Sequence, residues 1–474
     1  MNPAMKKLVV IGGGISGVAA AWRAAAQADR VPGGLEVHLF ERDAAPGGKA
    51  RTHRQDGWLV ETGPTAFMGD EPAVDELVAA AGLESERIAA DEAAAHRFVV
   101  RGGTMREVSA NPIRFARSGI LGPAGLLRIA LEPLVPARRD GADESVWSFA
   151  ARRIGRQAAD RLIAPMVLGV FAGDARRLSL PAAFPRLAAL EREHGSLVRG
   201  MIALKRSRSA RPRGGPAGSS APLWSFREGM QTLPRALARR GRFEVHCGAA
   251  AAAIEATADG RFRVRFERDG ACDADAVVVA TEPWAAAPLL RPLSPEAARE
   301  LDGITCPPVL VVALGYHGDA APGIPRGFGV LVPRGEGLRI LGCLFDTYLF
   351  PGRSPERHLL LRAMLGGAVD PEIAGADDAA LVATVREDLR RLAGITATPV
   401  FVSITRWPRA IPQYELGHLD RVRRIEERLS RWPALALAGN GLHGIAFGKA
   451  AAAGLRAADR VLEALARPVT ARAD

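Results

Sequence analysis

Short apolar runs alternate with a helical pattern at the beginning of the chain. Residues 6–11 form an apolar run typical of a buried parallel strand, and the Ala-rich stretch 18–28 predicts a helix. A second apolar run, 35–40, ends on Glu41. Strand, turn, helix and strand in this order predict the opening of a doubly wound α/β fold.

Beyond residue 110 the pattern changes twice. Residues 111–205 have a helical, strongly basic pattern, and residues 206–221, rich in Ser, Arg, Pro and Gly, are predicted to be a flexible loop. Strand-like runs then return at 243–246, 261–267, 276–280, 309–315, 328–333, 359–365 and 435–439. A Gly/Ala-rich helix ending near Ala466 follows. The first and last segments are therefore expected to share one α/β domain, with the middle inserted between them.

The turn after the first predicted strand carries three regularly spaced glycines. Gly12 permits a tight turn, Gly14 lets a pyrophosphate approach the backbone, and Gly17 lets the next helix pack closely on the strand. The start of that helix presents N–H groups to phosphate, and Glu41 is placed to bind ribose hydroxyls. Because an acid rather than an arginine follows the second strand, the pattern predicts a site for FAD or NAD.

A second glycine pair, Gly47 and Gly48, follows Glu41 and precedes Lys49 and Arg51. This segment resembles the second half of the extended fingerprint of the amine oxidase-like flavoproteins, where it crosses the pyrophosphate and the flavin. Residues 438–449 are similar to the flavin-closing motif of the same superfamily. The resemblance implies FAD as the cofactor, and a last helix whose N-terminus stabilises the negative charge of reduced flavin.

The cofactor-binding residues implied by the resemblance come from the glycine-rich turns, the acid after the second strand and the segments that cross the flavin. They are Gly12, Gly14, Ile15, Ser16, Gly17, Glu41, Arg42, Gly47, Gly48, Lys49, Gly63, Pro64, Thr65, Ala251, Trp407, Gly439, Asn440, Gly444, Ile445 and Ala446. No side chain is assigned a catalytic role, because the flavin carries the hard step.

Longer stretches resemble the protoporphyrinogen oxidases specifically. Residues 61–67 correspond to a Gly-Pro-x-Ser-Phe segment, with Ala66 in place of the usual Ser, and residues 169–174 are similar to a Gly-(Val/Ile)-Tyr-Ala-Gly-Asp signature. Further similar stretches lie at 178–185, 191–196, 327–333 and 407–418. Together these stretches cover nearly the whole chain. On their order and spacing, the chain is identified as a member of that family.

The resemblance implies an α/β fold with a discontinuous Rossmann-like FAD-binding domain, an α+β substrate-binding domain and a helical membrane-contacting insertion. The expected boundaries are 1–85, 222–297 and 415–467 for FAD binding, 86–110 and 298–414 for substrate binding, 111–205 for the helical insertion and 206–221 for the loop. The implied activity is oxidation of protoporphyrinogen IX to protoporphyrin IX. Six electrons would leave in three hydride transfers to flavin N5, with dioxygen or another acceptor regenerating the flavin.

Four residues are assigned to the substrate. Arg97 falls where the family contacts a substrate carboxylate, and a guanidinium can hold a propionate in bidentate fashion. Leu331 and Met364 fall near positions that sandwich the macrocycle, and Gly169 belongs to the signature segment. From the residues alone, Arg97 could also be a solvated arginine at a strand edge, and Leu331 and Met364 would be plain core residues. Met364 replaces a residue that is often aromatic in the family.

Three alternatives remain open. Coproporphyrinogen III oxidation to coproporphyrin III needs the same fold with a more polar, four-carboxylate pocket. A carotenoid desaturase or an amine oxidase shares the flavin fingerprint but lacks the signature at 169–174. A flavin-binding scaffold without turnover would hold flavin that no substrate reduces.

The formal net charge of +11 favours an anionic partner. No nucleic-acid-binding module is readable, so the acidic substrate or lipid headgroups are the expected partners. The basic amphipathic stretch 113–139 could lie on a membrane surface, with its apolar side down and arginines such as Arg128 toward anionic headgroups. Equally, it could cover the core as a solvated helix. The family resemblance favours the membrane, and a homodimer is left open.

The sequence contains no pattern typical of a metal site, a membrane span or a signal peptide. The four cysteines are scattered and the nine histidines do not cluster, which predicts no metal site. No apolar run reaches the roughly 20 residues of a membrane span, and a strand begins too early to leave room for a signal peptide. We therefore expect a cytoplasmic protein attached peripherally to the membrane.

Overall fold

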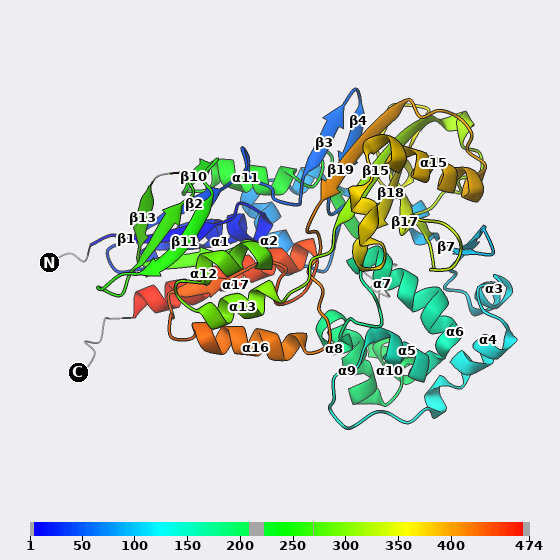
Figure 1. Cartoon of the computed structure of the whole chain (residues 1–474), viewed down its shortest axis with the longest axis horizontal. Helices are drawn as coiled ribbons and strands as arrows, with labels where there is room; N and C mark the ends of the chain where they lie inside the picture. Colours follow the sequence, from blue (N-terminus) through cyan, green and yellow to red (C-terminus); the bar gives the residue numbers. More distant parts are fainter. Residues whose placement is uncertain (1–3, 208–221, 269, 468–474) are drawn as a thin grey trace.

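Five parallel strands organise the part of the molecule that draws on both ends of the chain, at the left of Figure 1. The computed structural model describes residues 4–207, 222–268 and 270–467. In spatial order the strands are β10 (Glu244–Cys247), β2 (Leu35–Glu41), β1 (Lys6–Ile11), β14 (Ala276–Val279) and β20 (Leu435–Leu437). The apolar runs predicted at 6–11, 276–280 and 435–439 are thus neighbours in one sheet.

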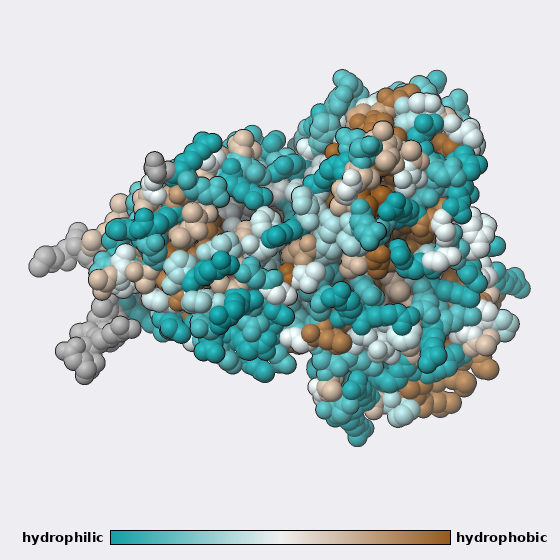
Figure 2. All heavy atoms as spheres, viewed as in Figure 1, coloured by the Kyte–Doolittle hydropathy of each residue, from teal (hydrophilic) through white to brown (hydrophobic). Residues whose placement is uncertain are grey.

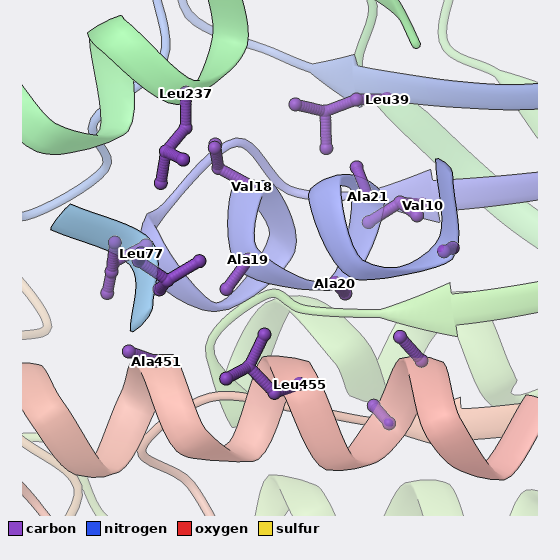
Figure 3. Packing of buried hydrophobic residues seen from close by; sticks show 14 of the residues in the cluster. Val10, Val18, Ala19, Ala20, Ala21, Leu39, Leu77, Leu237, Ala451 and Leu455 are labelled. Carbon is purple, nitrogen blue, oxygen red and sulfur yellow. The ribbon is translucent and has the colours of Figure 1, made fainter. Parts of the chain in front are cut away.

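Small residues let two helices pack closely on one face of this sheet. Where α1 (Ile15–Ala26) meets α17 (Phe447–Ala466), a Cβ on Gly454 would lie 1.9 Å from Ser16 O. Figure 3 shows Ala19 of α1 near Leu455 of α17, under strands β1 and β2. The same core takes in α2 (Pro72–Ala81) and α11 (Thr232–Arg240).

The opposite face of the sheet packs against a three-stranded antiparallel unit and three helices. These are β11 (Ala251–Ala256), β12 (Phe262–Phe266), β13 (Ala271–Ala274), α12 (Pro283–Leu290), α13 (Pro295–Asp302) and α16 (His418–Leu429). The sheet is therefore covered on both sides, as buried parallel strands require.

A seven-stranded, mostly antiparallel sheet lies at the upper right of Figure 1. Its order is β19 (Phe401–Trp407), β15 (Val309–His317), β18 (His358–Gly366), β17 (Gly342–Phe345), β16 (Gly329–Leu331), β7 (Arg97–Arg101) and β8 (Thr104–Glu107). Helix α15 (Asp378–Ala393) packs on one face through Leu381, Val385 and Leu389. The other face is left for the helical part and for the loops of the parallel sheet.

Short helices form the third part, at the lower right of Figure 1, as the basic helical pattern predicts. They are α3 (Pro112–Arg117), α4 (Pro123–Ala130), the 3-10 helix η4 (Glu132–Leu134), α5 (Val146–Ile154), α6 (Arg156–Ala158), the π-helix η5 (Ala159–Ile163), α7 (Ala164–Phe171), α8 (Leu180–Ala183), α9 (Pro185–His194) and α10 (Leu197–Ser207). A buried ion pair between Arg153 and Glu132 ties α5 to η4, and Glu132 also accepts the Leu197 N–H of α10 at 2.9 Å. Among the described helices, none is long and apolar enough to cross a membrane.

Short strands connect the parts. They are β3 (Thr52–Gln55), β4 (Trp58–Glu61), β5 (Phe67–Met68), β6 (Arg87–Ala89) and β9 (Leu223–Phe226), together with the short helix α14 (Asp346–Leu349). Strands β5, β9 and β6 form a small sheet, and β3 pairs with β4.

Some sequence-based boundaries were wrong. The first helix begins at Ile15, not at residue 18, because Gly14 is extended and acts as its N-cap. Residues 206 and 207 belong to α10 rather than to the predicted loop, and residues 208–221 lie outside the described residues. The stretch 113–139 is not one helix, because Gly119 (φ +73°) separates α3 from α4.

Candidate functional site

The turn between β1 and α1 is built by its glycines. Gly12 has φ +104°, and a Cβ on Gly17 would lie 1.8 Å from Gly12 O, so neither position accepts a larger residue. A Cβ on Gly14 would instead meet no protein atom within 4 Å. Helix α1 starts there without a side-chain cap and without an acid in its first turn. The first N–H groups of the helix are therefore suited to bind an anion that approaches Gly14.

Glu41 ends β2 with its carboxylate against this turn. It is buried and accepts the Gly13 N–H at 2.5 Å and the Asp43 N–H at 2.8 Å. A carboxylate can accept further hydrogen bonds beyond these two, so the group remains suited to hydroxyl ligands. The Ala249 N–H donates to Glu41 O at 2.9 Å, which brings the start of β11, with Ala251, toward Glu41.

The second glycine pair lies directly on the first turn. Gly47 pairs with Gly14 in an isolated parallel bridge, and its N–H donates to Gly13 O at 2.9 Å. Gly47 and Gly48 have φ of +144° and +56°, and a Cβ on Gly48 would lie 3.0 Å from Gly14 Cα. The two glycine motifs, separate in the sequence, thus form one backbone-lined surface.

Segment 61–65 and Lys49 extend this surface toward the seven-stranded sheet, called the second sheet below. The Lys49 ammonium forms an ion pair with Glu282 at 2.6 Å and donates to Ala410 O. A Cβ on Gly63 would lie 2.0 Å from Lys49 O, and Trp407 Nε1 donates to Thr62 O at 2.7 Å. Lys49, Gly63 and Trp407 are therefore brought together. Of the remaining assigned residues here, Pro64 and Thr65 are half-buried.

Arg42 is an exception among the assigned residues. Its side chain is exposed and stacks over Trp284, with 5.4 Å between the guanidinium carbon and the ring centroid. Only its backbone shares the turn with Glu41.

The loop 438–446 is held by its own side chains. The Asn440 amide nitrogen, oriented to suit its neighbours, donates to Gly444 O at 3.2 Å and Ala446 O at 3.3 Å. Gly439 and Gly444 have φ of +105° and +92°, and Ile445 packs against the helical part. Helix α17 then begins without a side-chain cap. The N-termini of α1 and α17 thus both lack a side-chain cap.

Polar atoms near these loops remain unsatisfied. Among the described residues, Thr281 Oγ1 and Glu282 Oε2 are buried without a hydrogen-bond partner, as are several polar atoms elsewhere in the molecule. Thr281 lies beside Gly12, and Glu282 pairs with Lys49. Buried polar atoms without partners are costly, so this part of the molecule fits a polar cofactor that would satisfy them.

Three of the four assigned substrate residues meet on the second sheet. Leu331 of β16 and Met364 of β18 both pair with Gly342 of β17, one from each side, and both are half-buried. A Cβ on Gly169 of α7 would lie 2.4 Å from Leu331 Cδ2. A larger residue at position 169 would displace the end of the Leu331 side chain.

Arg97 lies one strand further along the sheet. It pairs with Gly329 in the parallel ladder between β7 and β16, two residues before Leu331. Its guanidinium carbon lies 5.4 Å from the centroid of the Phe328 ring, and burial lowers the pKa of Arg97 from its ordinary value. The side chain is half-buried rather than fully solvated.

Arg362 was not predicted and connects the two halves of the site. It is fully buried, binds Asp346 at 2.7 and 3.0 Å, and donates to Glu61 O at 2.8 Å and Thr65 Oγ1 at 2.6 Å. Because Arg362 and Met364 lie on the same face of β18, this face of the sheet meets the segment 61–65. Burial raises the pKa of the Glu61 carboxyl to about 7, although the positive charge of Arg353 acts to lower this pKa. An arginine inside an apolar strand was the available signal.

Tyr414 and His418 lie in the stretch 407–418 that resembles the family but were not assigned to the site, and they support the loop 438–446. Their rings stack at 4.0 Å with an interplanar angle of 16°. Tyr414 OH donates to Asn440 O at 2.5 Å, and His418 Nε2 lies 3.0 Å from Leu442 O. Burial lowers the pKa of His418 to about 4, so the ring is neutral near pH 7 and donates to that carbonyl.

Comparison with known proteins agrees with this geometry. Residues 15–462 match the family described as flavin containing amine oxidoreductase. The chain is 32% identical to the chloroplastic protoporphyrinogen oxidase of Oryza sativa subsp. japonica, over 97% of this chain and 88% of the relative. It is 28% identical to the coproporphyrinogen III oxidase of Bacillus subtilis, over 94% and 95%.

A solved structure has the same fold over nearly its whole length. It is a protein from Exiguobacterium sp. 255-15 assigned as a protoporphyrinogen oxidase, with a TM-score of 0.83 and 26% identity, covering 97% of this chain and 99% of that one. The family match spans almost all of the described chain, and the glycine turns, the buried acid and the uncapped helices fit FAD. The chain therefore belongs to the flavin containing amine oxidoreductases, with FAD as its cofactor.

Proposed function

We propose that this flavoprotein oxidises protoporphyrinogen IX to protoporphyrin IX in tetrapyrrole biosynthesis, with dioxygen as electron acceptor. The observation that carries the proposal is the half-buried Arg97 at the edge of the half-buried apolar surface of Leu331 and Met364. A large apolar substrate with a propionate needs both features: apolar surface for the ring, and a guanidinium for the carboxylate. The similarity to plant protoporphyrinogen oxidases supports the choice.

The residues that would hold FAD follow from the geometry. The N–H groups of Ile15, Ser16 and Gly17 would bind the pyrophosphate as it passes Gly14, and Glu41 would bind the ribose. The backbone of Gly47–Lys49 and Gly63–Thr65, with Trp407 and the loop 439–446, would enclose the remainder, and Ala251 would lie at the adenine end. When bound, FAD supplies the acceptor for hydride from the substrate.

The side chains of this protein position the substrate surface beside the cofactor loops and partly enclose it. Arg362 holds segment 61–65 against β18, which keeps the substrate surface next to the cofactor loops. Gly169 lets α7 lie close to Leu331, which encloses part of that surface. Neither task needs a catalytic acid or base.

A second candidate is oxidation of coproporphyrinogen III to coproporphyrin III. It is favoured by the similarity to the Bacillus subtilis enzyme, which covers 95% of that protein. The four propionates of coproporphyrinogen III would require more cationic partners than the two of protoporphyrinogen IX, and one arginine, Arg97, is assigned to the substrate. We therefore place this substrate second.

We also propose the division of labour expected from the sequence: residues 1–85, 222–297 and 415–467 bind FAD, and residues 86–110 and 298–414 bind substrate. Residues 111–205 would contact the surface of the cytoplasmic membrane. Figure 2 shows apolar side chains gathered at the lower right, where α4 lies in Figure 1. The exposed large apolar residues of these helices include Ile113, Leu127, Leu131 and Leu134.

One part of the membrane expectation needs correction. Arg128 does not extend toward headgroups, because its guanidinium turns inward and donates to Arg153 O at 3.0 Å and to Arg152 O. The apolar side chains rather than Arg128 would therefore provide the contact. The proposal includes a cytoplasmic location and allows a homodimer.

Parallel turnover assays test the proposed substrate. The purified FAD-loaded protein is given protoporphyrinogen or coproporphyrinogen in air, and the fluorescence of the product porphyrin is followed. Faster formation of protoporphyrin, measured as kcat/KM, together with hydrogen peroxide is the expected result. Faster formation of coproporphyrin would establish the second candidate instead, and no turnover of either would reject both.

A further inference from the structure

Two histidines and a glutamate converge at the outer edge of the parallel sheet. His38 lies on β2, and Glu244 and His246 lie on the edge strand β10. In the described part of the chain, they are the one group of three His, Cys, Asp or Glu side chains whose ligand atoms gather closely enough to hold a metal ion. None of the three belongs to the FAD or substrate residues discussed above.

The spacing of the three atoms suits a tetrahedral ion. His38 Nδ1 lies 3.1 Å from His246 Nε2 and 3.4 Å from Glu244 Oε2, and the last two atoms are 3.5 Å apart. Zn²⁺ binds nitrogen and oxygen at about 2.0–2.2 Å in tetrahedral geometry. Two ligand atoms of such an ion are then roughly 3.3–3.6 Å apart. Both distances to Glu244 lie in this range, and the distance between the two histidine nitrogens, 3.1 Å, is slightly shorter.

The sheet holds this triangle in place. His38 pairs with Glu244 and Phe40 with His246 in the parallel ladder, so alternation puts all four on one face. The His246 ring stacks on Phe40 with centroids 4.5 Å apart and an interplanar angle of 15°. His38 is only 8% exposed. Few side-chain motions are therefore needed to receive an ion.

A fourth residue stands where metal sites commonly place a supporting carboxylate. Glu36 Oε1 lies 3.2 Å from His38 Nε2, the ring nitrogen that the triangle does not use; this is within ion-pair distance, but the two atoms form no hydrogen bond without the ion. A carboxylate on the outer nitrogen fixes the tautomer of a ligating histidine and raises its basicity. Lys7 lies 3.5 Å from Glu36 and balances its charge.

We propose that His38, Glu244 and His246 bind one divalent cation of the zinc class, with Glu36 as the outer partner of His38. Glu244 and His246 are more exposed than His38, so solvent supplies the fourth ligand. The ion joins the edge strand β10 to β2, the strand that ends at Glu41. An ion that binds the folded chain and not the unfolded chain stabilises the fold by mass action. The stabilisation is greatest at this edge of the FAD-binding sheet.

Metal titration of the flavin-loaded protein tests the site. The protein is prepared without a histidine tag, treated with a chelator, desalted, and titrated with Zn²⁺ by calorimetry. Co²⁺ is added in a parallel experiment and read by its visible absorption at wavelengths beyond those of the flavin. We expect one ion per chain, a tetrahedral Co²⁺ spectrum and a higher thermal unfolding midpoint with Zn²⁺.

Variants at the exposed ligands assign the ion to this site. Glu244→Gln and His246→Gln should abolish stoichiometric binding, whereas Glu36→Gln should weaken it roughly 10- to 100-fold. His317→Gln is the matched control, because His317 and His358 form another close histidine pair, with ring centroids 4.6 Å apart, and should bind as the wild type does. Absence of stoichiometric binding, or binding that survives both ligand variants, would overturn the proposal.

Discussion

Several side chains of the site hold backbone in place rather than reach a ligand. Arg362 fixes segment 61–65, and Tyr414 and His418 fix the loop that carries Asn440. These contacts join residues far apart in the chain, so no local pattern reveals them. The glycines and Glu41 were predictable because backbone approach to a phosphate imposes its own local spacing.

Arg97 offers the most specific test at the scale of a residue. Replacing it with Ala should lower kcat/KM for protoporphyrinogen roughly 10- to 100-fold, mainly through KM, because a charge-assisted hydrogen bond to a carboxylate is lost. The kcat/KM of Arg97→Lys should lie between those of the wild type and Arg97→Ala, since lysine keeps the charge but cannot bind a carboxylate in bidentate fashion. Steady-state kinetics from porphyrin fluorescence measures both.

The control for this series is Arg326→Ala. Arg326 is exposed over Tyr348, and its loss should leave the kinetics unchanged. Equal KM for wild type and Arg97→Ala would remove Arg97 from the substrate site.

Acid should destabilise the protein through His418. Its pKa is lowered by burial from 6.5 to about 4 in the folded chain, so between these values the unfolded chain binds a proton that the folded chain does not. Stability is therefore lost as the pH falls from 6.5 to 4, by up to about 3 kcal/mol from this group. His418→Gln should show a smaller drop in thermal unfolding midpoint between pH 7 and pH 5.

His53→Gln is the comparison for that experiment, because His53 is exposed on β3. It should retain the full acid sensitivity of the wild type. If His418→Gln loses as much stability as the wild type over the same range, burial of His418 is not the cause.

At the scale of elements, the β1–α1 turn separates folding from cofactor binding. Gly14→Ala adds a Cβ that meets no protein atom, at a backbone conformation that Ala accepts, so stability should change by less than about 1 kcal/mol. The same Cβ would stand where the pyrophosphate approaches, so FAD content should fall sharply. Gly17→Ala instead collides with Gly12 O and should lose both stability and FAD.

Thermal unfolding and the flavin-to-protein absorbance ratio of the purified variants measure the two effects separately. Retention of full FAD content by Gly14→Ala would show that the cofactor does not pass this turn.

Strand prediction was most direct for long strands that are buried on both faces. Residues 276–280 and 309–315 were found because buried strands give uninterrupted apolar runs. Strand β19 was not, because Ser403, Thr405 and Arg406 interrupt its apolar positions at an edge of the sheet. The triangle of His38, Glu244 and His246 was not predicted either, since the two histidines are 208 residues apart in the sequence.

At the scale of the molecule, the exposed apolar side chains of the helical part predict attachment to membranes. Leu131→Asp combined with Leu134→Asp should weaken binding to anionic vesicles at least roughly tenfold, because two leucines no longer enter the apolar layer. Co-sedimentation with vesicles measures this. Val400→Asp with Val402→Asp changes exposed apolar residues of the second sheet and should have no effect.

If both double variants bind vesicles as the wild type does, the helical part does not provide the contact. Turnover of a soluble porphyrinogen should be unaffected in either case, since neither pair lies in the substrate site.

Anaerobic mixing of the FAD-loaded protein with protoporphyrinogen tests the central claim most directly. The absorbance of the bound flavin is followed without oxygen, and air is then admitted. We predict that the flavin absorption disappears in the absence of oxygen and returns with air as porphyrin accumulates. A flavin that stays oxidised in the presence of both protoporphyrinogen and coproporphyrinogen would contradict the proposed function.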